Sequence, residues 1–283
     1  MSLTLPPRSV TDSILQAALA EDMGQAGDIT TDAIVSVGRA AQATIGARAV
    51  GCIAGLPFAC HTFCLLDGSV TVQSLVSDGV TVAPGQPLAA LRGPARALLT
   101  AERVALNLLG RLSGIATATA AFVTAVEGTG VRILCTRKTT PGLRSLEKYA
   151  VRAGGGFNHR FGLYDAILIK DNHLAVAGSV RQAVTSVRGQ VPPHTRIQVE
   201  VETLAQLEEA LDLGVDSLLL DNMDIPTLQR TVKLVDGRAT LEASGGITLD
   251  NARAIAETGV DYLSIGWLTH SAPALDVCLD FTG

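Results

Sequence analysis

The chain has 283 residues, 47% hydrophobic and 17% charged, which excludes a disordered protein and predicts two domains or one large α/β barrel. The formal net charge of −5 argues against a general nucleic-acid or membrane-surface binder. No run of 18 apolar residues lacks a charge, and the first residues contain no apolar core of a secretion signal. We therefore expect a cytoplasmic protein that neither spans a membrane nor binds nucleic acid.

The five cysteines form no paired framework, and their odd number fits a reducing compartment. The only tight Cys/His group is Cys60-His61-x-x-Cys64, which lacks a second pair at zinc-site spacing. It lies in an apolar stretch with helical periodicity. The pattern predicts cysteines that act as small apolar side chains in a helix core.

Residues 1–100 combine a predicted helix at 11–20 with short strands at 41–50, 70–75 and 88–91, which indicates an α+β domain. A long helical stretch follows at about 95–125, and we expect it to break near Ser113-Gly114.

Beyond residue 131 the pattern changes to strands alternating with helices of about ten residues, which is typical of parallel βαβ units. The last four strands begin about 22 residues apart, and no GxGxxG follows the first strand, so a barrel is favoured over a dinucleotide-binding sheet. The tail, 273–283, alternates like a strand, and we expect it to join the first domain. The predicted strands are 131–136, 165–170, 196–201, 217–221, 240–244 and 262–266.

All six predicted strands end in polar or glycine residues, and barrel enzymes place their chemistry at these carboxyl ends. One shared site is therefore predicted. Its residues are Thr136-Arg137-Lys138, Lys170-Asp171-Asn172-His173, Glu200 and Glu202, Asp221-Asn222, Ser244-Gly245-Gly246 and Ile265-Gly266, with Asn158-His159-Arg160 from the loop before the second strand.

Residues 131–173 hold eight Lys and Arg against three Asp and Glu, a balance of +5 inside an acidic chain. Such a cationic block suits a small polyanion bound by Arg and Lys side chains. Arg144, Lys148 and Arg152 fall at helical spacing, so for these three we favour a solvated helix face. Of only four lysines, two stand at predicted strand ends, Lys138 and Lys170.

Glu200 and Asp221 end neighbouring predicted strands, and carboxylates beside a phosphate site usually hold Mg²⁺. Strand alternation puts Glu200 and Glu202 on the same face, so the pattern does not choose between them; either could instead pair with an arginine. The Ser244-Gly246 turn and Gly266 match the usual barrel site where backbone N–H groups bind phosphate.

Several segments resemble the quinolinate phosphoribosyltransferase family, and in order they cover nearly the whole chain. They are EDMGQAGDITTDAI (21–34), AERVALNLLGRLSGIAT (101–117), the 38-residue run 136–173, VEVETLAQLEEAL (199–211), LLLDNM (218–223), EASGGI (242–247) and 259–281. A related family of molybdate-transport operons shares the fold but looks less similar over NHRFGLYDAILIKDNH (158–173).

The resemblance implies an α/β protein with type II phosphoribosyltransferase architecture: an N-terminal α/β sandwich (1–112, joined by a strand at 272–283) and an incomplete, open α/β barrel (113–271) of about seven strands. It implies transfer from phosphoribosyl pyrophosphate (PRPP) to quinolinate with Mg²⁺ and no organic cofactor, giving nicotinate mononucleotide, pyrophosphate and CO₂ in de novo NAD synthesis. It also implies a homodimer or larger assembly in which each site borrows Arg103 from its neighbour.

The resemblance further implies a role for each matching position. Arg103, Thr136, Arg137, His159, Arg160 and Lys170 would hold quinolinate. PRPP would be bound by Lys138, Asn172, His173, Ser244, Gly245, Gly246, Ile265, Gly266 and Trp267, and the metal by Glu200 and Asp221. Lys138, Glu200 and Asp221 would be catalytic, and the family pattern favours Glu200 over Glu202. Trp267 stands where a small residue is expected, so it would crowd the phosphate loop.

Two other classes compete with this interpretation. Lys170 at a strand end would also suit a Schiff-base aldolase, although the fixed positive charges with paired acids favour phosphoribosyl transfer. Residues 77–91 look like the turn-rich repeat of biotinyl or lipoyl carriers, but such carriers need an exposed lysine and the first 137 residues contain none.

Overall fold

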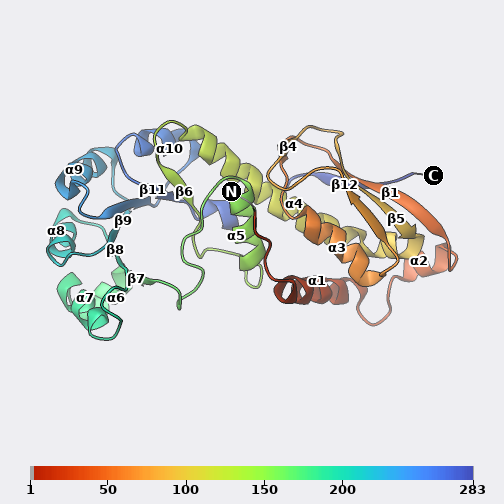
Figure 1. Cartoon of the computed structure of the whole chain (residues 1–283), viewed down its shortest axis with the longest axis horizontal. Helices are drawn as coiled ribbons and strands as arrows, with labels where there is room; N and C mark the ends of the chain where they lie inside the picture. Colours follow the sequence, from red (N-terminus) through yellow and green to blue (C-terminus); the bar gives the residue numbers. More distant parts are fainter. Residues whose placement is uncertain (1–2, 283) are drawn as a thin grey trace. The chain divides into compact units, whose positions relative to one another are not determined.

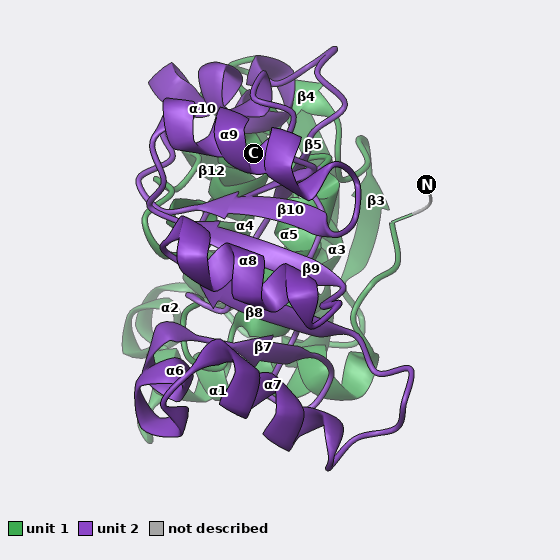
Figure 2. Cartoon of the chain, turned by 90° about the vertical axis from the view of Figure 1, so that its left-hand side faces the viewer, with its two compact units in different colours: residues 1–120, 139–155, 267–283 green, residues 121–138, 156–266 purple. Residues whose placement is uncertain are grey.

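The computed structural model describes residues 3–282 and forms two compact units (Figure 2). Unit 1 comprises the chain up to residue 120, residues 139–155 and the chain from 267 onward; unit 2 comprises 121–138 and 156–266. The domain boundaries expected from the sequence, 1–112 with 272–283 and 113–271, remain a proposal.

Unit 1 is built on a four-stranded sheet of order β12-β1-β5-β3 in which β1 pairs antiparallel with both β5 and β12 (Figure 1). Alternate residues of β1, such as Ala43 and Ile45, are fully buried because that face of the sheet covers the core. The strands of unit 1 are β1 (Ala40–Ala47), β2 (Gly51–Cys52), β3 (Thr71–Ser74), β4 (Thr81–Val82), β5 (Pro87–Pro94) and β12 (Val277–Thr282), with β2 paired to β4.

The core of unit 1 consists mainly of Leu and Ala with some Val and Ile, contributed by the sheet and by helices α1, α3 and α4, together with Phe63. Its helices are α1 (Arg8–Met23), α2 (Ile29–Ile34), α3 (Leu56–Leu66), α4 (Ala95–Ala125, whose last residues belong to unit 2), α5 (Arg144–Ala153) and α11 (Trp267–His270). Cys60 lies buried in α3, and burial raises the pKa of its thiol to about 12, so the predicted apolar role in a helix core is confirmed. His61 instead pairs with Asp12 at 2.9 Å.

Helix α4 runs without interruption, so the predicted break near Ser113-Gly114 is wrong. Ser113 Oγ accepts a hydrogen bond from the Ala54 N–H at 3.1 Å and donates to the Ala54 carbonyl at 3.2 Å. At Gly114 a Cβ would overlap the Pro273 carbonyl, so glycine permits a close backbone approach. Among the described residues α4 is the one helix long and apolar enough to cross a membrane, and 61% of its most apolar window is buried inside the structure, as in a core helix.

Helix α5 is largely buried, so the solvated face predicted for Arg144, Lys148 and Arg152 is wrong for Lys148, which is 2% exposed. Arg144 and Arg152 are half-buried. Most residues of α5 are buried, and helical spacing by itself does not show this.

Glu147 of α5 is completely buried and its charge is balanced within unit 1. It accepts hydrogen bonds from Arg111 Nη2 at 2.8 Å and Nε at 3.1 Å, and from the hydroxyl of Thr140 at 2.7 Å. Arg111 also donates to the carbonyls of Thr269 and Ala272. This ion pair therefore links α4, α5 and the segment around α11.

Unit 2 is built on a six-stranded parallel sheet of order β6-β11-β10-β9-β8-β7. All six predicted strands are observed, and β6 and β7 form its two edges, so the barrel is open as expected. Phe157 adds a single parallel bridge to Leu134 beside β6. The strands are β6 (Arg132–Leu134), β7 (Ile167–Ile169), β8 (Ile197–Val201), β9 (Ser217–Asp221), β10 (Thr240–Ser244) and β11 (Tyr262–Ser264).

The two faces of this sheet differ sharply in polarity. One face carries buried apolar residues such as Val199, Leu220 and Ala243, and helices α8 and α9 lie along the strands (Figure 2). The register aligns polar residues on the other face of β8, β9 and β10, among them Glu200 and Asp221. The helices of unit 2 are α6 (Asp171–Ala177), α7 (Val180–Arg188), α8 (Leu204–Asp212), α9 (Ile225–Val235) and α10 (Leu249–Ala256).

Replacing Glu147 by alanine should lower the free energy of unfolding by about 3–5 kcal/mol, because Arg111 then lacks the partner of its partly buried charge. Urea unfolding measures this loss. Arg253→Ala, which breaks the exposed pair with Glu257, is the matched control and should lower it by less than about 1 kcal/mol. Equal losses for the two variants would contradict the prediction.

Candidate active site

The polar face of the unit 2 sheet ends in a group of charged residues at the carboxyl edge of the strands. Because parallel strands share the same direction, the residues that end β7, β8, β9 and β10 lie along one edge. Lys170 follows β7, Glu200 lies in β8, Asp221 ends β9 and Ser244 ends β10. Unit 2 therefore contains the sequence-predicted site residues except Arg103 and Trp267, which belong to unit 1.

Lys170 and Glu200 form an ion pair, with Lys170 Nζ 2.8 Å from Glu200 Oε2. The Glu200 side chain is 7% exposed and that of Lys170 46%, so the pair lies at the border between the sheet and solvent. Glu202 is exposed, and its backbone N–H donates to Gln206. The structure thus distinguishes two acids that strand alternation leaves equivalent. Glu200 pairs with Lys170, whereas Glu202 is exposed.

Arg137 and Arg160 lie close enough for their positive charges to interact. Burial lowers the pKa of Arg160, and the neighbouring Arg137 guanidinium lowers it further, while Asp165 acts in the opposite direction. Arg160 Nη1 donates to the Ala166 carbonyl at 3.1 Å, and its buried Nε has no hydrogen-bond partner within the protein. Two like charges held together with a buried donor still available form a site that an anion would stabilise.

His159 belongs to a hydrogen-bond network that is connected to Arg160 through the Arg160 backbone. Its Nδ1 accepts the backbone N–H of Arg160 at 2.8 Å, and its Nε2 is 3.1 Å from Gln198 Oε1 and 3.5 Å from Glu242 Oε2. Gln198 Nε2 donates to Glu242 Oε2 at 2.8 Å. Sequence reasoning missed Gln198 and Glu242, although each stands two residues before a predicted strand-end residue and so on the same strand face.

The turn after β10 packs directly on the end of β9. The Asn222 N–H donates to the Ser244 carbonyl at 2.8 Å, and Asn222 Nδ2 donates to Asp221 Oδ2 at 2.7 Å. Gly245 has φ +90°, and a Cβ there would overlap Asn222 Oδ1. Only glycine therefore permits this turn in its observed position.

The remaining predicted residues have varied surroundings. Thr136 Oγ1 accepts the Lys138 N–H at 3.0 Å, and His173 Nδ1 accepts the Lys170 N–H at 2.8 Å. Asn172 is exposed at the start of α6. The Ile265 side chain is buried and its N–H bonds to Leu134, so Ile265 has neither group available for a ligand.

In unit 1, Arg103 lies on α4 with its side chain 65% exposed. It lines a groove of about 330 Å³ together with apolar residues of α1 and α4, among them Leu15 and Leu108. Trp267 begins α11 and is 40% exposed.

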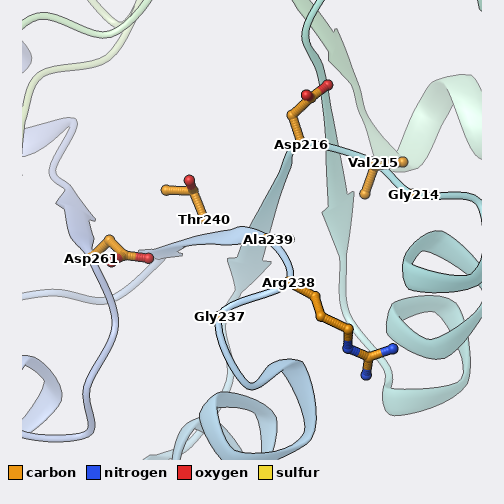
Figure 3. Close-up of a pocket in the computed structure, with 8 residues that line it drawn as sticks. All are labelled: Gly214, Val215, Asp216, Gly237, Arg238, Ala239, Thr240 and Asp261. Carbon is orange, nitrogen blue, oxygen red and sulfur yellow. The ribbon is translucent and has the colours of Figure 1, made fainter.

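A pocket of about 400 Å³ lies at the opposite, amino end of β9, β10 and β11 (Figure 3). Its acids already bind the backbone: Asp216 accepts the Ile197 N–H at 2.9 Å and Asp261 the Leu241 N–H at 2.7 Å. These carboxylates tie neighbouring strands together, and residues at this end of a barrel serve stability. We therefore assign the chemistry to the carboxyl end.

The fold of unit 2 is an open α/β barrel whose charged residues gather at the carboxyl ends of its strands, where barrel enzymes place their chemistry. The family model for the N-terminal domain of quinolinate phosphoribosyl transferase matches residues 28–113, and that for its C-terminal domain matches residues 115–280. The chain therefore belongs to the quinolinate phosphoribosyltransferase family.

Relatives cover nearly the whole chain. It is 47% identical to the probable nicotinate-nucleotide pyrophosphorylase [carboxylating] of Bacillus subtilis, over 93% of this chain and 90% of that protein. It is also 47% identical to the nicotinate-nucleotide pyrophosphorylase [carboxylating] of Mycobacterium leprae, over 94% and 95% of the two chains. The crystal structure of NadC from Streptococcus pyogenes is similar with a TM-score of 0.94, 42% identity and full coverage of both chains.

Gly245→Ala should lower the free energy of unfolding more than Gly246→Ala. Both positions have positive φ, +90° and +60°, so both substitutions strain the backbone by about 1–3 kcal/mol. Only at Gly245 does the added Cβ meet Asn222; at Gly246 nothing lies within 4 Å. Chemical denaturation of the two variants measures the difference. Equal losses in the free energy of unfolding would show that the packing of the turn on Asn222 does not contribute to stability.

Proposed function

We propose that this chain transfers the phosphoribosyl group of PRPP to quinolinate and releases CO₂, forming nicotinate mononucleotide and pyrophosphate for NAD synthesis. The observation that carries the proposal is the adjacent pair of Arg137, which follows β6, and Arg160, in the loop before β7, in a chain that belongs to this family along nearly its full length. Quinolinate carries two carboxylates on adjacent ring carbons, and two neighbouring guanidiniums match such a dianion.

For quinolinate, the proposed ligands are Arg137, Arg160 and Lys170, with Thr136 beside them. Lys170 is paired with Glu200, so we propose that it turns toward a quinolinate carboxylate when the substrate enters. His159, whose backbone neighbour is Arg160, is proposed as a further quinolinate ligand.

For PRPP, the proposed ligands surround the acidic side of the site. Lys138, Asn172 and His173 would hold the pyrophosphate side, and Gly266 with the Ser244-Gly246 turn would hold the 5′-phosphate. Ile265 is included as a PRPP-binding residue only because its backbone directly precedes Gly266. Trp267, the next residue in the sequence, completes the proposed set.

Magnesium fits the acids that are present. Among the described residues no three His, Cys, Asp or Glu side chains are grouped to hold a metal ion, so this part of the chain has no ready-made metal cage. Mg²⁺ in phosphate-transfer sites is usually held by one or two carboxylates plus substrate phosphates, and Glu200 and Asp221 on adjacent strands supply two. When bound, Mg²⁺ would neutralise charge on the pyrophosphate.

The chain's own residues suffice for the rest of the reaction. As the C1–O bond to pyrophosphate breaks, the carboxylates of Glu200 and Asp221 stabilise positive charge on the ribose, and Lys138 stabilises the departing oxygen. The pyridine nitrogen forms the new bond to C1 with inversion. The resulting pyridinium accepts the electron pair when the adjacent carboxylate leaves as CO₂, and a proton from solvent replaces it. This sequence requires no organic cofactor.

The competing classes receive less support. A Schiff-base lysine must be a neutral amine, whereas Lys170 is engaged with a carboxylate as an ammonium ion. In the carrier-like segment 77–91, Asp78 is tied to the backbone N–H groups of Gly55 and Leu56 and to the Tyr149 hydroxyl at 2.6 Å, so this segment is anchored rather than presented as a mobile arm. A cytoplasmic location without nucleic-acid or membrane partners stays a prediction from composition.

The assay that tests the function combines purified protein, quinolinate, PRPP and Mg²⁺ and measures nicotinate mononucleotide, with nicotinate as control substrate. We expect Lys138→Ala to lower kcat by about 10²-fold or more with little change in the quinolinate KM, because it removes charge stabilisation at the leaving group. Arg160→Ala should mainly raise the quinolinate KM, about tenfold or more. An unchanged quinolinate KM in Arg160→Ala would remove Arg160 from the substrate site.

We propose a homodimer or larger assembly in which Arg103 completes the quinolinate site of the neighbouring subunit. Its exposed guanidinium beside an apolar groove suits an interface between copies. Co-expressed Arg103→Ala and Arg160→Ala subunits with different tags can be purified as mixed dimers. If Arg103 acts across the interface, one of the two sites carries neither change, so we expect about half the wild-type activity. Inactive mixed dimers would contradict this sharing.

A further inference from the structure

The loop that carries Arg160 contains a carboxylate that the reaction described above does not use. This loop begins after Phe157, which is bridged to Leu134 beside β6, and it ends where β7 starts at Ile167. Because β6 and β7 are the two edges of the sheet, residues 158–166 connect opposite edges and belong to no strand or helix. Their backbone N–H groups therefore need acceptors other than a strand ladder.

Asp165 supplies two such acceptors with the two oxygens of its carboxylate. Its Oδ2 accepts the backbone N–H of Phe161 at 2.5 Å, and its Oδ1 accepts that of Gly162 at 2.8 Å. Gly162 is buried, so its N–H would be costly to leave without an acceptor. A carboxylate that accepts two successive N–H groups closes residues 161–165 into one compact turn.

Arg160 is attached to this turn at both ends of the residue. Its backbone continues directly into Phe161, whose N–H Asp165 accepts. Its guanidinium donates from Nη1 to the carbonyl of Ala166, the residue that follows Asp165, at 3.1 Å. A displacement of the turn would therefore move the backbone and the guanidinium of Arg160 together.

We propose that Asp165 is a positioning residue for Arg160, whose guanidinium it holds in place by closing the turn 161–165. This inference rests on the proposed function, because it assigns Arg160 to quinolinate. The guanidinium of Arg160 is partly buried beside that of Arg137, and two like charges by themselves favour separation. A restraint built into the loop keeps the two guanidiniums together before the substrate enters.

The charge of Asp165 by itself would act on quinolinate in the opposite direction. Asp165 lies close enough to Arg160 to raise the pKa of its guanidinium. A negative charge beside an anion site repels the anion, so the loss of the charge alone should tighten quinolinate binding. Loss of the turn should weaken binding, because the guanidinium is then no longer held in one place. The direction of the change in the quinolinate KM separates these two effects.

Asp165→Ala removes both the charge and the two hydrogen bonds that close the turn. We expect the quinolinate KM to rise about tenfold or more, with kcat within about threefold of wild type and the PRPP KM unchanged. Asp165→Asn keeps one acceptor oxygen, so its quinolinate KM should lie between those of wild type and Asp165→Ala. A quinolinate KM in Asp165→Ala at or below the wild-type value would overturn the inference.

Asp216→Ala is the matched control. Asp216 is also an exposed residue of unit 2 whose carboxylate accepts a backbone N–H, that of Ile197 at 2.9 Å, but it lies at the amino end of the strands. We expect a loss of about 1 kcal/mol in the free energy of unfolding and wild-type values of both KM. If Asp216→Ala raised the quinolinate KM as much as Asp165→Ala, a general loss of stability would explain both effects and the inference would be wrong.

Hydrogen exchange tests the turn without any substrate. Mass spectrometry of peptides from residues 158–166 should show slow exchange of the Phe161 and Gly162 amides in wild type and in Asp216→Ala. In Asp165→Ala we expect these two amides to exchange about tenfold faster or more. Fast exchange in wild type, or a raised KM in Asp165→Ala without faster exchange, would overturn the inference. A wild-type protein with slow exchange that does not convert quinolinate would instead contradict the proposed function.

Discussion

The site depends on a sheet whose two faces have opposite solvation requirements. One face of the strands in unit 2 packs with Leu, Val and Ala, so the alternate residues must point to the opposite side of each strand. At the strand ends this side reaches solvent, because the Lys170 side chain that pairs with Glu200 is 46% exposed. Polar groups are therefore permitted there, and the parallel register brings them to one edge.

Charge is distributed unevenly along that edge. Arg137 and Arg160 lie close enough for the charge of Arg137 to lower the pKa of Arg160, whereas Lys170 forms an ion pair with Glu200. An anion bound beside the two arginines would reduce their mutual repulsion. The affinity of this edge for anions therefore depends on how its cations are arranged, which the number of cations in the chain does not show.

Each unit contains its own close packing. In unit 2, Gly245 lets the turn after β10 lie on Asn222, because a Cβ at 245 would overlap that side chain. This packing supports the edge that holds Arg137 and Arg160, whose like charges by themselves favour separation. In unit 1, the Glu147–Arg111 pair ties three segments together, and Glu147 is completely buried.

The sequence by itself determined the six strands of unit 2, the residues that follow them and the family, because alternation, periodicity and long motifs are local signals. It did not predict helix α6 at Asp171–Ala177, and it expected Glu202 to share a strand face with Glu200, whereas β8 ends at Val201. Only the tertiary structure decided that Glu200, not Glu202, meets Lys170, that α4 continues through Ser113, and that Lys148 is buried. The network of Gln198 and Glu242 likewise joins strands more than 40 residues apart. Each of these outcomes depends on which distant side chain comes within hydrogen-bonding distance, and inter-strand register and packing fix that distance, whereas local pattern fixes only the face.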